Sequence, residues 1–515
     1  MLGTGSEPAF MCIALGRTDT LRVVPAALGP ALVRDMVTAA WRRGIAREAV
    51  VNGACELVLR GSPWADWSSG QDDARMLVLA LVRSLAARGW RLAACINPNR
   101  KPTSKDALFF VRSPDRCGST LLALSLNGAD RLRVVGAQQS GCAAKIFEAI
   151  RAAIAAAWPP GLRDEHARDS SHRFVLAGSP WEPHSDADTA AARRLVAAVV
   201  EAVLRVGFNV VACVHLQGGS GAGAQGAAAH EGAPHAVSSA SASAPADRPS
   251  QSIPDTWIFQ HALDPDLVPM PSFSRNDMQP LVCCAVDSAD SLSLHAGPAE
   301  LAESLASDLA AVWPQGVRLV AGSTPTIRFN GAPWRGIGED SVHCRRLLLA
   351  VIASMARSGR RLVASAQISA VWSTPSLVFE ASSDPPPRSG SPAARLCAVS
   401  LVETATLRLI PAHAATDDAA ASSGDDPHTH AAARAVDAAL AACGISASKS
   451  HFVGVPEWSL KAMDWTASGA PAAAARGLVL SLLEAMHAAG WRIVASCRVT
   501  SRADQCDTLV FGRSA

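Results

Sequence analysis

Tyrosine is absent from the 515 residues of this chain, so its aromatic packing depends on 13 tryptophans and 12 phenylalanines. Several motifs of well-defined chemistry are missing as well. There is no C-x-x-C, no H-E-x-x-H, and no glycine-rich loop that ends in Lys-Ser or Lys-Thr. These absences exclude the common zinc motifs and the phosphate loop of nucleotide hydrolases. We therefore expect no metal and no cofactor.

Long apolar runs are also missing, because none approaches the ~20 residues that a membrane-spanning helix needs. Residues 1–16 have neither the basic start nor the apolar centre of a secretion signal. The formal net charge is only +2, so no strong field attracts nucleic acid or an acidic membrane surface. The 13 cysteines are odd in number and many lie within apolar runs, as buried thiols do. We expect a reduced intracellular protein, cytoplasmic or nuclear.

What the sequence does contain is a fourfold repeat. Each copy opens with a strand that ends in a Gly-Ser-Pro-Trp-like motif, followed by a helix and further strands, and such self-similarity indicates a tandem architecture. The length is too great for one core and suits three or four domains. The tryptophans of the four motifs are Trp64, Trp181, Trp334 and Trp458.

The repeated unit has the order strand, helix, four strands, helix. The chain begins with two strands and a helix and ends after a strand, a helix and two strands, so it resembles a circular permutation of whole units. We expect an α+β fold of four β-α-β(4)-α modules with antiparallel sheets, in which the N-terminal ββα segment completes the C-terminal βαββ segment. Residues 10–15 should then continue the sheet that contains 509–511. The expected modules are 55–162, 172–317, 326–445, and a composite of 10–45 with 451–513.

Two stretches within the copies stand out. The first helix of copy one is apolar nearly all round, which predicts that it lies between its own sheet and a neighbouring module. Residues 218–252 are rich in Gly, Ala and Ser, and such a composition predicts a flexible surface insertion within the second module.

The ordered motifs resemble a known pattern. The Gly-x-Pro-Trp motif, a Gly-Trp helix end (Gly89-Trp90), an Asp-Thr-Leu-x-Phe strand (507–511) and an Asp-x-Leu-Arg strand (130–133) together are similar to an uncharacterised family of tandem-repeat fungal proteins. Copies two and three depart from this pattern at Phe208, Arg360 and Ser376. The resemblance implies the repeat architecture and brings no activity or cofactor.

The repeated tryptophans have two interpretations. A row of exposed indole faces would form a stacking platform for bases or ligands. The alternative, which we favour, is that each proline ends a strand and each tryptophan fills the gap between sheet and helix, so that all four are buried at the strand-to-helix junction.

A recurrent arginine precedes the apolar run of each first helix, at Arg75, Arg193, Arg345 and Arg476. A cation in the first turn opposes the helix dipole at a cost of roughly 0.3–1 kcal/mol, so it needs a partner. We expect Arg75, Arg193 and Arg476 to pair with the aspartates that open a strand of their own units, Asp106, Asp255 and Asp507. Copy three has Ser376 there, so Arg345 should turn elsewhere. An anionic ligand is the alternative partner.

A small residue recurs on one strand as Cys95, Cys213, Ser365 and Ser496, and it fits a buried strand position better than a nucleophile. The leading functional hypothesis is a non-enzymatic scaffold that binds a protein partner. A second hypothesis is small-molecule binding in cavities between sheet and helix. A third is nucleic-acid binding on a sheet face, supported by Arg22, Arg133 and Arg408 but weakened by the near-neutral charge.

Overall fold

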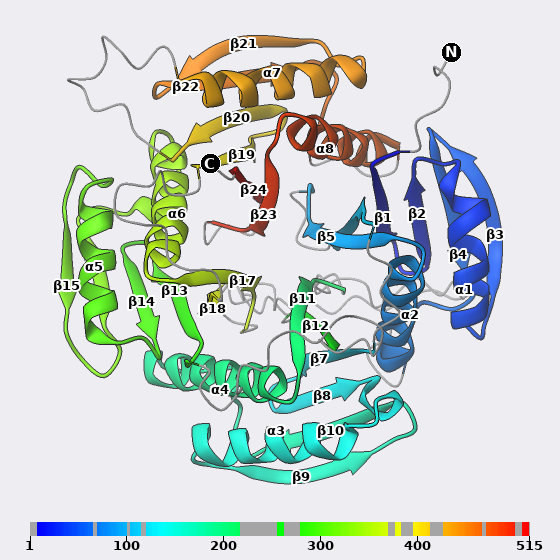
Figure 1. The fold of residues 1–515 in the computed structure, drawn as a ribbon, viewed down its shortest axis with the longest axis vertical. Coiled ribbons are helices and arrows are strands. Elements are labelled where there is room, and N and C mark those ends of the chain that lie inside the picture. Colours follow the sequence, from blue (N-terminus) through cyan, green and yellow to red (C-terminus); the bar gives the residue numbers. More distant parts are fainter. Residues whose placement is uncertain are drawn as a thin grey trace, which may run out of the picture.

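The computed structural model describes residues 8–64, 70–99, 104–114, 120–216, 255–261, 279–368, 376–382, 395–412, 426–465, 470–499 and 507–513. The expected insertion at 218–252 therefore lies outside the described residues. Within them the chain forms four similar modules, each of six strands and two α-helices in the order ββ-α-ββ-α-ββ. The modules follow one another along the chain and surround a central axis (Figure 1).

Module 1 contains β1 (Phe10–Gly16), β2 (Thr20–Val24), α1 (Arg34–Ala40), β3 (Ile45–Val51), β4 (Ala54–Leu59), α2 (Gly70–Ala86), β5 (Trp90–Ile96) and β6 (Ala107–Arg112). Module 2 contains β7 (Leu121–Asn127), β8 (Arg131–Val135), α3 (Ala143–Ala157), β9 (Leu162–Ala167), β10 (Ser171–Leu176), α4 (Asp186–Arg205), β11 (Phe208–Val214) and β12 (Thr256–His261).

Module 3 contains β13 (Val282–Ser288), β14 (Ser291–His295), α5 (Ala299–Ala310), β15 (Val317–Val320), β16 (Thr326–Phe329), α6 (Asp340–Arg357), β17 (Arg360–Ala366) and β18 (Ser376–Ala381). Module 4 contains β19 (Arg395–Val402), β20 (Thr406–Pro411), α7 (Pro427–Ala442), β21 (Ala447–Phe452), β22 (Val455–Leu460), α8 (Ala470–Ala488), β23 (Arg492–Cys497) and β24 (Thr508–Arg513). Three short helical turns, η1 (Gly29–Val33), η2 (Ala137–Gln139) and η4 (Pro333–Arg335), complete the described elements.

Each module has its own antiparallel sheet, and the strand order is the same in all four. In module 1 it is β3-β4-β2-β1-β6-β5. The expected α+β class with four antiparallel modules is therefore confirmed, with six strands per sheet rather than five. The outer strand β3 is largely exposed, whereas the central strand β1 is buried along its whole length, so each sheet runs from solvent towards the axis.

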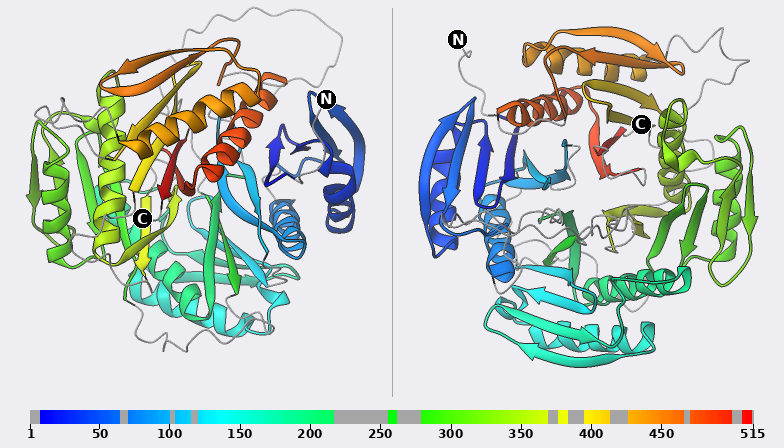
Figure 2. Two further views of the ribbon diagram at one scale, coloured as in Figure 1. Left: turned by 45° about the horizontal axis from the view of Figure 1, so that its top comes forward. Right: turned by 180° about the vertical axis from the view of Figure 1, so that it is seen from behind.

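The long helices α2, α4, α6 and α8 explain this burial. Each packs on its own sheet and also contacts the next module, α2, α4 and α6 through its first two strands and α8 through β1, so these strands are covered on both faces. The nearly all-round apolar character of α2 was the sequence feature that predicted this double coverage, and Leu77, Leu81 and Leu85 are fully buried. The packing continues from module 4 to module 1, because α8 contacts β1 and one apolar cluster joins Phe10 and Cys12 to Leu478 and Leu482. The four modules thus form a closed ring (Figures 1 and 2).

The expected composite module needs a correction. Strand β1 pairs with β6, where Phe10 lies opposite Val111, and β24 pairs with β19. The N-terminal ββα segment therefore completes the sheet that follows it, and it meets the C-terminal segment only through packing of α8. The strand orders are consistent with a permuted repeat, because a unit counted from β4 contains the same elements as one counted from β1. Such a unit spans two sheets, so the expected boundaries at 55–162, 172–317 and 326–445 are displaced by half a repeat.

The motif tryptophans are buried, each at most 2% exposed. Trp64, Trp181 and Trp334 occupy the expected junction after a strand. In each, the backbone N–H donates to the turn between the first two strands of the module, as from Trp64 to the carbonyl of Thr18. Trp458 is a correction, because it lies within β22. Its junction position is taken by Trp465, whose N–H donates to the carbonyl of Thr404.

Candidate functional site at the axis of the ring

Four strands line the axis, one from each module: β5, β11, β17 and β23. They contact one another around the ring, and each carries a register shift near its middle, such as the one between Leu92 and Ala94. A bulge bends a strand and redirects its side chains. The small residues of these strands permit the close approach of four backbones.

Neighbouring modules are joined at the axis by a repeated aspartate contact. In three interfaces, the aspartate before the last strand of one module pairs with the residue that follows the axial strand of the next module. The carboxylate of the aspartate accepts a hydrogen bond from the backbone N–H of that residue. The backbone N–H of the aspartate donates to the carbonyl of the same residue. The pairs, with carboxylate-to-nitrogen distances, are Asp106 with His215 (2.7 Å), Asp255 with Gln367 (2.8 Å) and Asp507 with Asn97 (2.8 Å). These aspartates therefore join the modules, and the last pair closes the ring.

The expected pairing of these aspartates with the helix arginines is wrong. No hydrogen bond or ion pair joins Asp106, Asp255 or Asp507 to Arg75, Arg193 or Arg476 in the described part of the chain. Ser376 is also misassigned, because strand pairing makes it equivalent to Thr256 and Thr508 rather than to the aspartates. The position before it, 375, lies outside the described residues.

The arginines instead lie at the module interfaces. In Arg75 and Arg345 the Nε–H donates to the hydroxyl that begins the last strand of the next module, Thr256 at 3.4 Å and Thr508 at 3.2 Å. Their Nη1 groups donate to the carbonyl four residues earlier in the helix. The arginine is thus an interface contact, and its partner is a hydroxyl of the next module rather than a carboxylate of its own.

The other two arginines vary this arrangement. Arg193 forms an ion pair with Asp287 of module 3. Arg476 faces module 1, where Ala107 occupies the place of the threonine and has no hydroxyl to offer. The Nε of Arg476 accordingly has no hydrogen-bond partner among the described residues, although the side chain is only 5% exposed. Burial lowers the pKa of this guanidinium.

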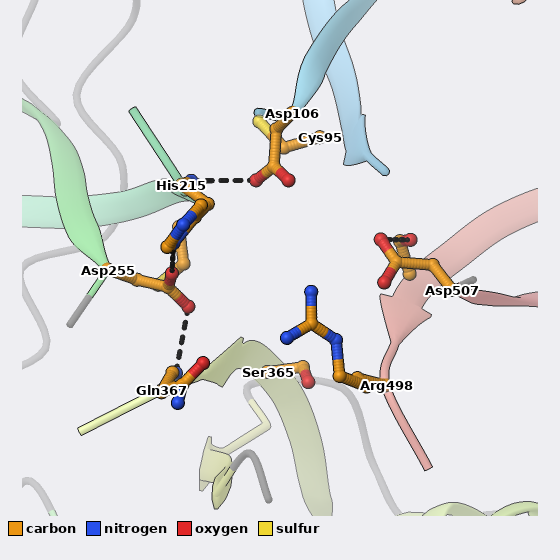
Figure 3. Close-up of a pocket in the computed structure, with 10 residues that line it drawn as sticks. Cys95, Asp106, His215, Asp255, Ser365, Gln367, Arg498 and Asp507 are labelled. Carbon is orange, nitrogen blue, oxygen red and sulfur yellow. Dashed lines mark hydrogen bonds and ion pairs between the residues drawn. The ribbon is translucent and has the colours of Figure 1, made fainter. Parts of the chain in front are cut away.

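The axial strands and the aspartates line a polar cavity of about 50 Å³ (Figure 3). Its walls come from all four modules. The lining residues are Cys95, Asp106, Cys213, His215, Asp255, Ser365, Gln367, Ser496, Arg498 and Asp507. Figure 3 shows the carboxylates of Asp106 and Asp507, the imidazole of His215 and the guanidinium of Arg498 around a common space.

Hydrogen bonds order part of this lining. His215 Nδ1 lies 3.2 Å from Asp255 Oδ1, and the Ser496 hydroxyl donates to Asp507 at 2.9 Å. Arg498 projects into the space, and its Nε has no hydrogen-bond partner among the residues that the structure describes. Three carboxylates therefore face one guanidinium and one imidazole.

Crowding of these carboxylates changes their protonation. Burial, together with the charges of Asp507 and Asp255, raises the pKa of Asp106 to about 7, and the nearby His215 opposes the rise. Burial also raises the pKa of Asp507, although Arg498 opposes it. At neutral pH the carboxyl of Asp106 is consequently protonated in some molecules and ionised in the others.

The cysteines of the cavity are protonated thiols. Burial raises the pKa of Cys95 and Cys213 well above the ordinary value, and the surrounding aspartates add to the rise. A thiolate is therefore strongly disfavoured in this cavity. Across the described ranges, no group of three or more His, Cys, Asp and Glu side chains is arranged to hold a metal ion.

Sequence reasoning found the aspartates and the Cys/Ser position but not their common destination. Asn97, His215, Gln367 and Arg498 are equivalent in the four copies, two residues after the Cys/Ser position. Their side chains differ in every copy, so the repeat concealed them. Side chains two residues apart lie on the same face of a strand, so each of these residues shares a face with the Cys/Ser position before it. That spacing was the signal that could have identified them from the sequence.

The third hypothesis relied on Arg22, Arg133 and Arg408, which are buried or half-buried in ion pairs. Arg22 pairs with Glu56 at 2.9 Å, Arg133 with Asp72 at 3.1 Å, and Arg408 with Glu457 at 2.6 Å. Compensated guanidinium groups between packed elements do not form an open row for phosphates.

Fold and site together define a closed ring of four α+β modules around a polar axial cavity. One model of an uncharacterised domain family matches the chain four times, at residues 9–111, 120–229, 280–380 and 395–512, so the chain belongs to that family. Each match begins at or just before the first strand of a sheet rather than at the start of a unit expected from the sequence; the first, third and fourth end with the last strand of their sheet, and the second ends before β12. No curated protein and no solved structure matches the chain. The fungal origin that the motif resemblance implies stays a prediction.

Of the helices in the described ranges, none is both long enough and apolar enough to cross a membrane.

Proposed function

We propose that the protein is a non-enzymatic binding scaffold whose ring holds a small cationic group, a protonated amine, in the axial cavity. The observation that supports this most strongly is the convergence of Asp106, Asp255 and Asp507 from three modules on one cavity. When all three are ionised they carry three negative charges against the one guanidinium of Arg498, so the space then favours a cation. An ammonium group also supplies the N–H donors that carboxylate oxygens accept.

The size of the cavity limits the ligand. A volume of about 50 Å³ has room for a few water molecules, at roughly 10–15 Å³ for each. A group of a few heavy atoms, such as methylammonium or the end of a lysine side chain, fits this volume. A nucleotide or a sugar does not.

The chemistry of the lining argues against a cysteine enzyme. A nucleophilic thiol needs a lowered pKa and a base within hydrogen-bond reach. The thiols of Cys95 and Cys213 have raised pKa values, and no hydrogen bond joins either thiol to His215 in the described structure. Binding is therefore the better interpretation of this site.

The cavities between sheet and helix that the second hypothesis required receive no support. Large apolar side chains fill that space in each module, as Trp64, Leu57 and Leu81 do in module 1. The axial cavity lies between modules instead, so ligand binding and the scaffold role belong to the same feature of the ring.

Calorimetric titration of the full chain with methylammonium at constant ionic strength tests the proposal. We expect saturable binding to the native protein and weaker binding to Asp507→Asn, in which the amide oxygen still accepts the N–H of Asn97. Glu303→Asn, on the exposed face of α5, is the matched control and should bind like the native chain. Absence of saturable binding, or equal binding by Asp507→Asn, would contradict the proposal.

Two sources supply such an amine, a free small molecule and a lysine of a partner protein. Titration with Nα-acetyl-lysine methylamide distinguishes them. Tighter binding of the lysine derivative than of methylammonium favours a protein partner, as the scaffold hypothesis expects. Binding of methylammonium alone favours a free amine.

A further inference from the structure

A second cavity, of about 340 Å³, lies between modules 3 and 4, away from the axial residues. One wall is the segment that precedes and begins α6, and the other is the turn between β19 and β20 with the end of β21 (Figure 1). Its lining residues are Gly336, Ile337, Gly338, Ser341, Leu401, Val402, Glu403, Thr404, Arg408 and Phe452. Domain interfaces are a frequent place for ligand sites, and roughly 300–1,000 Å³ is the usual size of such a pocket.

Four of the ten lining residues have large apolar side chains. Leu401 and Val402 are buried at the end of β19, and the ring of Phe452 stands at the end of β21. Ile337 is 58% exposed, which is unusual for a large aliphatic side chain in this structure. A ligand with an apolar body would cover Ile337 and Phe452 together.

Arg408 forms the polar floor and is already committed to other groups. Its Nε donates to Glu457 at 2.6 Å, its Nη1 donates to Ser341 at 2.7 Å, and its guanidinium lies 3.9 Å from the centre of the Phe452 ring. A guanidinium whose donors are used in this way is a rigid wall rather than a receptor for an anion.

Glu403 supplies the charge at the mouth. Its side chain is 70% exposed and lies 3.5 Å from Arg408, which is already neutralised by Glu457. The two carboxylates and one guanidinium leave one uncompensated negative charge beside the apolar wall. The cavity therefore favours a cation and disfavours an anion.

The carboxylate of Glu403 is presented by a turn that several modules share. Its φ is +52°, in the left-handed region, and the equivalent turns have Arg17 in module 1 and Gly128 in module 2, with φ +46° and +56°. The shape of the turn therefore belongs to the repeat, while its side chain differs between modules, and module 4 has a carboxylate there at the mouth of the cavity.

The geometry points to a binding site at the interface of modules 3 and 4 for a small amphipathic cation, with a flat apolar body against Phe452 and Ile337 and a protonated amine at Glu403. The ligand is larger and more apolar than the one that the axial cavity accommodates. The two sites share no residue.

Phenethylamine is a suitable probe, and 2-phenylethanol is its neutral counterpart. In calorimetric titrations of the full chain at neutral pH, we expect saturable binding of phenethylamine and binding at least fivefold weaker for 2-phenylethanol. Glu403→Gln should weaken phenethylamine binding roughly fivefold, as loss of a partly exposed ion pair does. Thr404→Trp, at an exposed position of the lining, should fill the mouth and abolish binding while the thermal unfolding midpoint stays the same.

Two controls keep the result separate from the axial cavity. Glu303→Gln removes an exposed carboxylate elsewhere and should leave phenethylamine binding unchanged. Asp507→Asn alters the axial cavity and the contact between modules 4 and 1, neither of which borders this site, and should also leave phenethylamine binding unchanged. No saturable binding of phenethylamine, equal binding of 2-phenylethanol, or undiminished binding by Thr404→Trp would each overturn this site without bearing on the axial one.

Discussion

The carboxylate of Asp507 accepts a hydrogen bond of 2.8 Å from the backbone N–H of Asn97, a residue 410 positions earlier in the chain. This contact joins the last strand of module 4 to the axial strand of module 1. It is the same contact that joins module 1 to module 2 and module 2 to module 3. Ring closure therefore uses the same chemistry as the contacts between consecutive modules.

Asp507→Ala should weaken this closure. The substitution leaves the buried N–H of Asn97 without an acceptor, which costs about 1–3 kcal/mol. Asp507→Asn keeps an acceptor oxygen and should cost less. Urea unfolding measures the difference, with the exposed Glu303→Ala as control. Equal stability of Asp507→Ala and Asp507→Asn would show that the hydrogen bond contributes little.

Ala107→Thr should stabilise the same interface. It restores the hydroxyl that Arg75 and Arg345 find in the next module and that Arg476 lacks. Ala107→Val has the same shape without the acceptor and is the matched control. We expect the threonine variant to be about 1 kcal/mol more stable than the valine variant in urea unfolding. A valine variant of equal or greater stability would mean that Arg476 does not reach this position.

The raised pKa of Asp106 predicts a pH-dependent stability. A carboxyl whose pKa rises from its ordinary value of 3.8 to about 7 in the ring stabilises the fold fully below pH ~4 and loses that contribution as pH rises through 7. Asp106→Asn cannot ionise and so escapes this loss. Relative to the native chain, Asp106→Asn should gain roughly 2–4 kcal/mol of unfolding free energy between pH 4.5 and pH 8. A difference that stays constant with pH would contradict the raised pKa.

Trp465→Ala tests the corrected assignment of the junction tryptophan. Trp465 is 1% exposed and fills the gap that Trp64 fills in module 1. Truncation of a buried tryptophan costs about 3–5 kcal/mol, and unfolding of module 4 should account for the loss. Hydrogen exchange measured by mass spectrometry should show the greatest increase in module 4. Uniform exchange across all modules would show instead that the ring unfolds as one unit.

The repeat in the sequence was sufficient to predict four antiparallel α+β modules and helices covered on both sides. The packing of α2 between two modules could be predicted because its surface is apolar nearly all round. The boundaries between sheets did not follow, because a closed ring has the same order of elements from any starting point. Only a pairing such as Phe10 with Val111 determines where one sheet ends.

The site was harder to predict for a related reason. Each of its polar groups belongs to a different module, and hydrogen bonds such as that from His215 to Asp106 join residues more than 100 positions apart. Arg498 and His215 stand where the other two copies have the amides Asn97 and Gln367. A comparison of the repeats looks for residues that recur, so it does not select these two. Their shared place at the axis appears only when the ring is closed.

We propose that the axial cavity binds a small cation through its aspartates. Titration of methylammonium into the native chain and into Asp106→Asn, at pH 6 and at pH 8, tests this binding most directly. Because Asp106 gains its charge between these values, the native chain should bind more tightly at pH 8, and binding by Asp106→Asn should depend less on pH. Native binding that is absent at both pH values, or equally dependent on pH in Asp106→Asn, would contradict the account.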